Sequence, residues 1–533
     1  MTGEDNTLII AIEFGTTYSG IGYIHTAAGR VPSRQARSSN PLAAEKCDKR
    51  KGTNVSNDCV HYGYKLYLNI LSSEILYDGN KHTIEWGFQA QGNIRALKYF
   101  TLELDPKARA KLKALRSDTE SSRSFVRNHG PRSAVVGEYE PNRDAKDVCT
   151  DYLQAIYLAA LEQINNLWVP APKRFILTVP AIWTDPAKNA TKQGARSAFG
   201  QRADIELIAE PQAAAIHTLS QAHMIQSVRA GNHYIICDAG GGTVDLITYC
   251  VKRKEPLELV ESIPGTEEAC GSIFLNRAFE DFLKVRLGRY YTGRRTETLE
   301  KWLRDARRRF DVEGLPPELY GARIHGTEET CLIITGRDVA RMFDPTIVRV
   351  LSLISDQVTT LIHRRRHCPE LGIVMVGGFG RSGYLYKRVK HKFEHLATVT
   401  RPPDAWASIA LGALCWGMNH ETVTARKLPR CYGQQVYVKY NPNCGYPSVP
   451  HPVTGEPSHE AMQWFVEASY EVGYMTIDLT EPRRSGPAPC LRSDGKGSYQ
   501  KLDFRMWLLF GSEIVFRAEF EGTSQDARAN YTN

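Results

Sequence analysis

One short sequence pattern occurs twice in the chain, and it constrains the fold more than any other feature of the sequence. Residues 8–24 read LIIAIEFGTTYSGIGYI, and residues 234–251 read YIICDAGGGTVDLITYCV. Each segment has an apolar run that ends near an acidic residue, then a turn of glycine and threonine, then a second apolar run. This pattern predicts a β-hairpin, and its repetition predicts two related lobes.

The segments around the hairpins alternate between helical and strand-like patterns. Apolar residues at spacings of three and four mark a long helix over 148–164. Further helices are expected at 185–199, from 211, and at 272–287, 336–366, 384–394 and 405–418, with strands at 175–179, 205–209 and 373–376. Strands that alternate with helices on a repeated core predict an α/β fold.

The composition changes after about residue 420. Residues 441–458 are rich in Pro, Gly, Ser and Asn and are typical of a long loop. Beyond them, 502–510 and 514–520 flank Gly-Ser-Glu at 511–513, which predicts a β-hairpin. We therefore expect one lobe over 1–225, a second over 226–420, and a linker with a small β-rich region over 421–533.

Composition excludes several classes of protein. The net charge of +8 is dilute for 533 residues, so a nucleic-acid partner is not expected. No apolar stretch approaches the roughly 20 residues of a membrane span, so no membrane partner is expected either. The 12 cysteines form no CxxC pair, and the amino-terminus is acidic and unlike a signal peptide. We expect a cytoplasmic protein with reduced thiols.

The two glycine turns carry the chemistry. In Gly15-Thr16-Thr17 and Gly240-Gly241-Gly242-Thr243, small side chains let backbone N–H groups approach a ligand, and such arrays bind anions. Glu13 and Asp238 precede the turns, and Asp245 begins the next strand. Carboxylates beside phosphates need a hard cation between them, and Mg²⁺ is the usual one. The pattern therefore predicts a site for a Mg²⁺-bound nucleotide.

Two other phosphate motifs fit the sequence less well. No GxxxxGK[ST] segment occurs, so the chain is not a P-loop protein. Residues 378–383 match GxGxxG, but the next strand, near 398–401, has no acidic residue for a ribose. A glycine-rich wall for a nucleoside is the better interpretation.

These motifs together resemble a known superfamily. LIIAIEFGTTYSG is similar to the first phosphate motif of the actin, sugar-kinase and heat-shock ATPases, CDAGGGTVD to the second, and IVMVGGFGRSGYL to the adenosine motif. RFILTVPAIWTDPAKNAT, LIAEPQAAAIHTL and DAWASIALGALCWG resemble segments of DnaK-type chaperones of the heat shock protein 70 family. The resemblance covers about residues 8–418. It implies a duplicated ribonuclease H-like, actin-like ATPase fold of two lobes, with ATP or ADP and Mg²⁺ in the cleft.

The resemblance also assigns roles to residues. Glu13 and Asp238 would hold hydrated Mg²⁺, with Asp245 beside them, and Glu210 would orient the attacking water. The residues that would contact the nucleotide are Gly15, Thr16, Thr17, Tyr18, Gly240, Gly241, Gly242, Thr243, Gly377, Gly378 and Arg381.

Three departures from the family pattern concern the rate of hydrolysis. The family has Asp where this chain has Glu13. It has a catalytic lysine where the best local match, GFQAQ at 87–91, places Gln91, and Lys98 is the alternative. Cys270-Gly271-Ser272 replaces a glycine-glycine-acid motif.

We therefore expect an ATP-binding, heat-shock-70-like protein with slow or vestigial hydrolysis, in which the nucleotide state sets lobe closure. A pseudo-ATPase scaffold is the alternative, and a small-molecule kinase of the same superfamily is a third. Client proteins or co-chaperones are the partners that the resemblance implies.

Overall fold

A computed structural model describes the central part of the chain and separate strands beyond it. The described residues are 7–26, 47–48, 53–54, 59–61, 64–77, 84–91, 93, 96–106, 108–109, 144–167, 171–181, 183–221, 228–288, 322–323, 331–332, 334–364, 370–418, 423–425, 432–439, 448–450, 456–466, 490–491, 498–499, 505–510, 514–520 and 523–527. Contacts divide the chain into two compact units, Met1–Lys427 and Leu428–Asn533.

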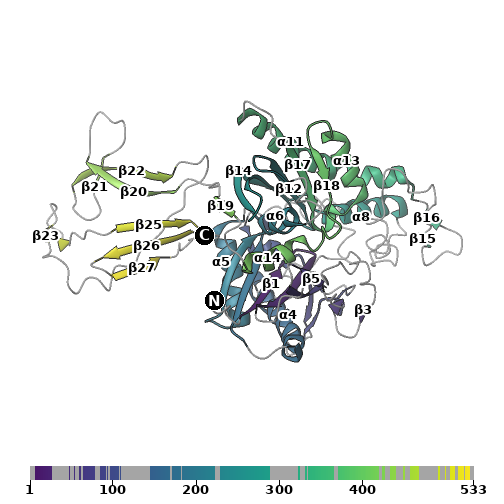
Figure 1. Cartoon of the computed structure of the whole chain (residues 1–533), viewed down its shortest axis with the longest axis horizontal. Coiled ribbons are helices and arrows are strands. Elements are labelled where there is room, and N and C mark those ends of the chain that lie inside the picture. The colour runs from purple at the N-terminus through teal and green to yellow at the C-terminus, as the bar shows by residue number, and fades with distance from the viewer. Residues whose placement is uncertain are drawn as a thin grey trace. The chain divides into compact units, whose positions relative to one another are not determined.

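The first unit contains a six-stranded sheet built around the first predicted hairpin (Figure 1). Its strand order is β11 (Asp204–Ala209), β10 (Lys173–Val179), β1 (Leu8–Glu13), β2 (Tyr18–His25), β6 (Tyr64–Ser72) and β5 (Cys59–His61). Strands β11, β10 and β1 are parallel, whereas β1, β2 and β6 are antiparallel. We call this the first sheet.

A second six-stranded sheet is built around the second hairpin. Its order is β18 (Thr398–Thr400), β17 (Leu371–Val376), β12 (His233–Ala239), β13 (Val244–Arg253), β14 (Glu258–Glu268) and β19 (Val423–Ala425). Strands β18, β17 and β12 are parallel, and β12, β13 and β14 are antiparallel. Five strands thus have the same order and direction in both sheets. Strand β19 extends the first unit beyond the expected boundary after residue 420 because it pairs with β14.

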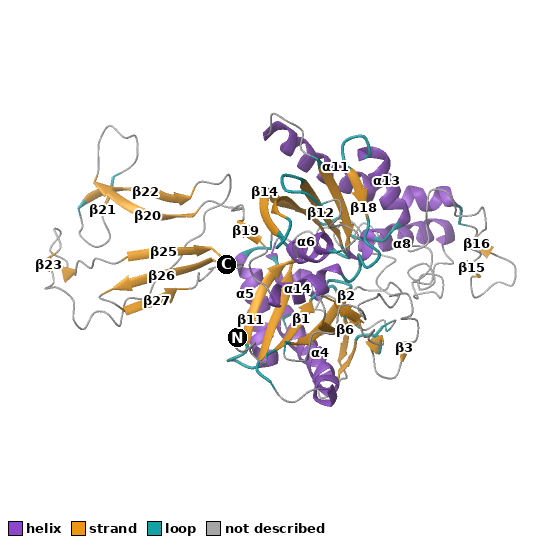
Figure 2. Cartoon of the chain, viewed as in Figure 1, coloured by secondary structure: helices purple, strands orange, loops and turns teal. Residues whose placement is uncertain are grey.

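Helices cover the sheets in layers, as Figure 2 shows in purple and orange. Helices α4 (Ala145–Leu167) and α5 (Asp185–Phe199) pack on the outer face of the first sheet. Helices α8 (Ile273–Leu287), α11 (Gly336–Arg364) and α13 (Gly383–Phe393) pack on the outer face of the second sheet. Helices α6 (Glu210–Ser220) and α14 (Ser408–Met418) lie between the sheets. The α/β prediction is confirmed.

Alternation along the central strands explains the layers, since neighbouring residues of a strand face opposite sides. In β1, Ile10 and Ile12 join the outer core with α4 and α5, whereas Ile9 joins the core between the sheets. In β12, Ile235 faces the outer core and Ile236 the central one. Both hairpin strands are therefore apolar on both faces, which is why they read as continuous apolar runs.

Smaller elements complete the described part of the first unit. Strands β8 (Ile84–Trp86), β7 (Glu74–Tyr77) and β9 (Leu97–Lys98) form a three-stranded sheet that precedes a 3₁₀ helix, η2 (Phe100–Leu104). A four-residue helix, α12 (Gly377–Gly380), follows β17. Two-stranded ribbons are formed by β3 (Cys47–Asp48) with β4 (Thr53–Asn54), and by β15 (Ala322–Arg323) with β16 (Cys331–Leu332).

In the second unit the described residues are all in or beside strands. Strands β20 (Tyr432–Lys439), β22 (Pro457–Val466) and β21 (Val449–Pro450) form one antiparallel sheet. Strands β25 (Arg505–Phe510), β26 (Ile514–Phe520) and β27 (Thr523–Ala527) form another, and β23 (Cys490–Leu491) pairs with β24 (Ser498–Tyr499). The pairing of Phe510 with Ile514 agrees with the hairpin expected around 511–513. Among the described helices of the chain, none is long and apolar enough to cross a membrane.

Candidate functional site

The ends of the central strands surround one cavity of about 220 Å³. The carboxyl ends of the parallel strands β10, β11, β1, β12 and β17 all lead into it, which is where α/β sheets place their ligand sites. The predicted residues that line it are Glu13, Gly15, Thr16, Thr17, Tyr18, Glu210, Asp238, Gly240, Gly241, Gly242, Thr243, Gly377, Gly378 and Arg381. Segments far apart in the sequence thus meet at one site.

The second glycine turn is held by the backbone at the start of α8. The carbonyl oxygens of Gly240, Gly241 and Gly242 accept hydrogen bonds from the N–H groups of Ser272 (3.1 Å), Ile273 (2.9 Å) and Gly271 (3.1 Å) respectively. In a trans peptide the N–H points opposite to the carbonyl of the same unit. The N–H groups of Gly241, Gly242 and Thr243 therefore point away from α8. Three successive N–H groups aimed one way form an anion-binding concavity.

The first glycine turn is held by one residue instead. The Ser73 hydroxyl donates to the carbonyl of Gly15 (2.7 Å), and the Ser73 N–H donates to the carbonyl of Thr17 (3.0 Å). By the same peptide geometry, the N–H groups of Thr16 and Tyr18 point away from Ser73. Ser73 Oγ also lies 2.9 Å from Ser19 Oγ, so the turn rests on a buried pair of hydroxyls.

The two turns touch each other, and glycine is required where they do. A Cβ at Gly241 would lie 2.4 Å from Thr17 Oγ1, and a Cβ at Gly242 would lie 3.0 Å from Thr16 Oγ1. Behind them, a Cβ at Gly271 would lie 2.3 Å from the carbonyl oxygen of Gly241. The threonines of one turn thus occupy the space that glycine leaves free in the other.

A wall of the cavity is formed by residues 377–382. Gly377 has φ of +81°, a left-handed conformation that favours glycine. A Cβ at Gly377 would also lie 2.3 Å from Asp238 Oδ1, so its missing side chain leaves room for this carboxylate. The Gly377 N–H donates to the carbonyl of Ala405 (2.9 Å), and Ser382 caps α13 through the N–H of Leu385.

Carboxyl groups crowd one part of the cavity, next to Gly377. Glu13 Oε2 and Asp238 Oδ1 are buried and have no hydrogen-bond partner among the described residues. A buried polar atom without a partner costs about 1–3 kcal/mol. The Glu13 carboxyl also accepts a hydrogen bond from the Ala410 N–H, in the first turn of α14 where N–H groups lack helical partners. The two free oxygens are candidate cation ligands.

Burial and mutual repulsion shift the titration of these groups. Burial raises the pKa of Glu13 to about 8, against the lowering effect of the Ala410 hydrogen bond. Burial, then the charge of Asp245, then that of Glu13 hold the pKa of Asp238 well above its usual range. Burial and the neighbouring carboxylates, Asp238 first, do the same to the pKa of Glu210. A cation would reverse these shifts because it favours the ionised carboxylates.

The donor set fits a magnesium ion that keeps part of its water shell. Across the described residues, no three His, Cys, Asp or Glu side chains lie together as a complete metal site. Mg²⁺ is ordinarily held by one or two carboxylates, waters and phosphate oxygens. Glu13 and Asp238 would be the protein ligands in that arrangement.

Two of the predicted residues do not line the cavity. Asp245 is buried behind it, where Asp245 Oδ2 accepts from the Thr243 hydroxyl (2.8 Å) and Oδ1 from the Ala181 N–H (3.3 Å). Burial raises the pKa of Asp245 to about 6 although both hydrogen bonds lower it. Gln91 is exposed in a turn after β8 and is not among the lining residues. The alternative, Lys98, is buried with its Nζ 2.6 Å from Glu74 Oε2 and does not line the cavity either.

Further lining residues were not among the predicted ones, and they include Thr101, Trp183 and Trp406. Thr101 is the lining residue of η2, and its Oγ1 lies 3.5 Å from Thr16 Oγ1. Trp183 is buried, and its Nε1 has no hydrogen-bond partner within the described part of the chain. Among the described lining residues, Arg381 is the one basic side chain. The signal for Trp183 and Trp406 was present, since both lie in segments that resemble the family.

Comparisons with known proteins give weak but consistent matches over about half of the chain. No family model matches the chain. The chain is 22% identical over 361 residues to Heat shock 70 kDa protein 12A of Homo sapiens, a match that covers 52% of this chain and 53% of that protein. It is 28% identical over 240 residues to the Chaperone protein HscA homolog of Aromatoleum aromaticum, which covers 45% of this chain and 36% of that protein.

The mouse Heat shock 70 kDa protein 12A matches at 22% over 349 residues, so the chain spans about half the length of the two mammalian proteins. Two of the three relatives are heat shock 70 kDa proteins and the third is a chaperone protein, which agrees with the resemblance found in the sequence. The chain is therefore a divergent heat-shock-70-like protein.

Proposed function

We propose that this protein binds ATP and ADP with Mg²⁺ in the cavity between the two sheets, and that it hydrolyses ATP slowly. The observation that carries the proposal is the second glycine turn, whose three N–H groups point away from α8 beside Asp238, a buried carboxylate with an unpartnered oxygen. The N–H groups would bind phosphate oxygens, and Glu13 and Asp238 would hold the cation. Bound Mg²⁺ would neutralise phosphate charge.

The strand order supports the finer picture of the fold. Five strands of the first sheet correspond in order and direction to five of the second. This correspondence favours a duplicated ribonuclease H-like fold with lobes over 1–225 and 226–420. A nucleotide that bridges the turns Gly15–Tyr18 and Gly240–Thr243 would draw the lobes together, so its state would set their closure.

The lining of the cavity supports slow turnover. Hydrolysis builds negative charge on the γ-phosphoryl oxygens, and a cationic donor aimed at them lowers the barrier. Arg381 is the one basic residue in the described lining, on the wall where the resemblance places adenosine. Thr101, a neutral residue, lies beside Thr16 on the phosphate side. Glu210 would orient the attacking water, with Asp245 behind it.

Calorimetric titration with Mg-ATP and Mg-ADP tests binding. Ionised ligands must replace protonated carboxyls when a cation binds, so binding should release protons. Titrations in buffers of different ionisation enthalpy measure this release. Asp238→Ala should weaken binding strongly in Mg²⁺ and less in EDTA. Equal affinity of Asp238→Ala and the parent in Mg²⁺ would contradict the proposal.

Single-turnover hydrolysis tests the rate. Thr101→Lys places an ammonium group beside Thr16, and we expect it to raise the rate of ATP cleavage with a smaller effect on affinity. Gln91→Lys, the change that the sequence favours, is the matched control, because Gln91 lies outside the cavity lining. An increase with Gln91→Lys alone would restore the sequence-based assignment. A fast parent rate that Lys98→Ala abolishes would refute slow turnover.

A scaffold that binds nucleotide without turnover is the second candidate, and the lack of a lysine in the described lining favours it. Phosphate release in the absence of any acceptor separates the ATPase from this scaffold. ADP formation that depends on an added acceptor would instead identify a small-molecule kinase. The family relationship also makes client proteins or co-chaperones candidate partners and the cytoplasm the candidate location.

A further inference from the structure

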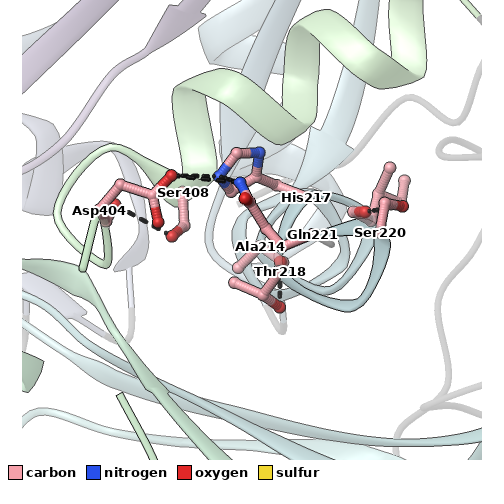
Figure 3. A network of polar contacts seen from close by, with 8 residues as sticks. Ala214, His217, Thr218, Ser220, Gln221, Asp404 and Ser408 are labelled. Atoms are coloured by element: carbon pink, nitrogen blue, oxygen red, sulfur yellow. Dashed lines mark hydrogen bonds and ion pairs between the residues drawn. The ribbon is translucent and has the colours of Figure 1, made fainter. Parts of the chain in front are cut away.

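A buried polar network joins helix α6 to the segment that precedes α14 (Figure 3). His217 Nε2 lies 2.7 Å from Asp404 Oδ2. The Gln221 amide nitrogen lies 2.8 Å from His217 Nε2 and 3.3 Å from Asp404 Oδ2. The His217 side chain is 0% exposed, whereas that of Asp404 is 18% exposed. With Nε2 protonated, His217 donates to the Asp404 carboxylate, and the Gln221 amide donates to that carboxylate rather than to the ring.

The network stands out in its surroundings. Helix α6 is buried along its length, and the residues around His217 in the core between the sheets are apolar, Ile216 and Leu219 among them. A histidine in such a place costs free energy unless it is paired. An apolar residue would fill the same space without this cost, so packing alone does not explain the pair.

Both ends of the network lead to the cavity. Helix α6 begins at Glu210, a lining residue two turns before His217, or about 10 Å along the helix axis. On the other side, Asp404 precedes Ala405, which accepts the hydrogen bond from the Gly377 N–H, and Trp406, which lines the cavity. The Asp404 carbonyl accepts from the Ala407 N–H (2.8 Å) and from the Ser408 hydroxyl (3.1 Å), which fixes the segment onto α14.

The network also joins the two sheets. Helix α6 follows β11, the edge strand of the first sheet, and Asp404 follows β18, the edge strand of the second. Helices α6 and α14 also pack directly on each other, so closely that a Cβ at Gly412 would lie 1.7 Å from the carbonyl oxygen of Ala213. The hydrogen bonds of His217 add a polar connection to this apolar contact.

We propose that His217 and Asp404 form a latch, a pair of positioning residues that holds Glu210 at the distance from Gly377 and Trp406 that nucleotide binding requires. The latch touches no ligand itself. It acts through α6 on one wall of the cavity and through residues 405–406 on the other. This inference rests on the proposed function, because it assigns the latch a role in nucleotide affinity.

Calorimetric titration of the full chain with Mg-ADP, together with thermal unfolding of each variant, tests the latch. Asp404→Ala leaves the His217 ring buried without its acceptor, so it should lower the melting temperature and weaken Mg-ADP binding about tenfold. Adding His217→Leu replaces the buried ring that has lost Asp404 with an apolar side chain and should restore the melting temperature. The double variant should nevertheless bind Mg-ADP as weakly as Asp404→Ala alone, because the two walls remain unlatched.

Two more variants control the experiment. His217→Gln retains an N–H donor for Asp404 and should bind within about threefold of the parent, since the hydrogen bond is kept. Thr218→Val changes a buried residue of the same helix whose hydroxyl donates to the Ala214 carbonyl, away from Asp404 (Figure 3). Its affinity should equal that of the parent.

The outcomes separate this inference from the proposed function. A parent that binds no adenine nucleotide overturns the proposed function and the latch with it. A parent that binds, with Asp404→Ala and His217→Gln at equal affinity, overturns the latch alone. Recovery of affinity together with stability in the double variant also overturns it, because the pair would then serve only the fold.

Discussion

The two glycine turns line the same cavity, yet they are held in different ways. The turn at Gly240–Thr243 is fixed by three backbone N–H groups at the start of α8. The turn at Gly15–Tyr18 depends on Ser73, through one side-chain and one backbone hydrogen bond. Backbone groups are present whatever the residue is, whereas a hydroxyl is lost with a single substitution. Both turns are sensitive to added atoms, since a Cβ at Gly15 would lie 2.2 Å from the carbonyl oxygen of Tyr18, whereas a lost hydroxyl weakens only the first turn.

The largest effect is expected for Gly271→Ala. The new Cβ would lie 2.3 Å from the carbonyl oxygen and 2.5 Å from the carbonyl carbon of Gly241, so the backbone of the turn has to move. Overpacking of this kind costs roughly 1–3 kcal/mol of stability. It would also displace the N–H groups of the turn, which would then no longer point in one direction. We expect Mg-ADP binding to fall below detection by calorimetry, with a lower melting temperature.

Gly380→Ala is the matched control for that substitution. Gly380 is also buried beside the cavity wall, but a Cβ there would lie 3.6 Å from its nearest neighbour, an ordinary contact. Its affinity and melting temperature should stay near those of the parent. Normal Mg-ADP binding by Gly271→Ala would show that α8 does not hold the turn.

A change of pH should have an intermediate effect on the melting temperature. The pH range of this effect differs between the acidic residues beside the two turns. The folded protein raises the pKa of Glu13 from 4.5 to about 8 and that of Asp245 from 3.8 to about 6. The native state thus binds more protons than the unfolded state, so the free energy of unfolding falls as pH rises. Without ligand, the melting temperature should fall from about pH 4.5 to 8 because Glu13 loses its proton, and from about pH 3.8 to 6 because Asp245 does.

Neutral variants measured at pH 8 sharpen this comparison. Asp238→Asn removes a carboxyl group that interacts with Asp245 and Glu13, whereas Glu13→Gln removes one that accepts the Ala410 N–H. We expect Asp238→Asn to raise the melting temperature of the ligand-free protein more than Glu13→Gln does. Mg-ADP should flatten the pH dependence of the parent. A melting temperature that rises from pH 5 to 8 would contradict the assignment of protonated carboxyls.

The smallest effect is expected for Ser73→Ala. The substitution removes the hydrogen bond to the Gly15 carbonyl but keeps the backbone bond to Thr17, so it should cost about 1 kcal/mol and a few-fold in Mg-ADP affinity. Ser220→Ala is the control, since its hydroxyl donates within α6 to the Ile216 carbonyl. If both variants bind alike, the first turn does not depend on the Ser73 hydroxyl.

The sequence predicted those parts of the molecule that carry a local signal. Both hairpins, the glycine turns and the helices α4, α5, α6, α8, α11, α13 and α14 follow from apolar periodicity and from glycine beside threonine. The central strands could be predicted because both of their faces are buried, so their sequences are continuous apolar runs. Strands β6 and β14 were not predicted, although each pairs with a hairpin strand and β6 has apolar residues at alternate positions.

The residues misplaced or missed are those fixed by distant contacts. Gln91 was chosen from a short local match, but the path of the chain through β9 and η2 brings Thr101 to the cavity instead. Asp245 was expected at the ligand, and its hydrogen bonds to Thr243 and Ala181 hold it one layer behind. His217 was not singled out, although a histidine within an otherwise apolar stretch of EPQAAAIHTL was a usable signal.

The position of α14 has a consequence for synthesis of the protein. Gly417 of α14 packs so closely on β1 that a Cβ there would lie 2.6 Å from Ile9 Cγ2. Roughly 400 residues separate these contacts, which a ribosome adds in about 20–80 s at 5–20 residues per second. During that time the nascent chain lacks the helix that covers this part of its first strand. Strand β1 of this relative of the heat shock 70 kDa proteins therefore remains without its contact to α14 until most of the chain has been synthesised.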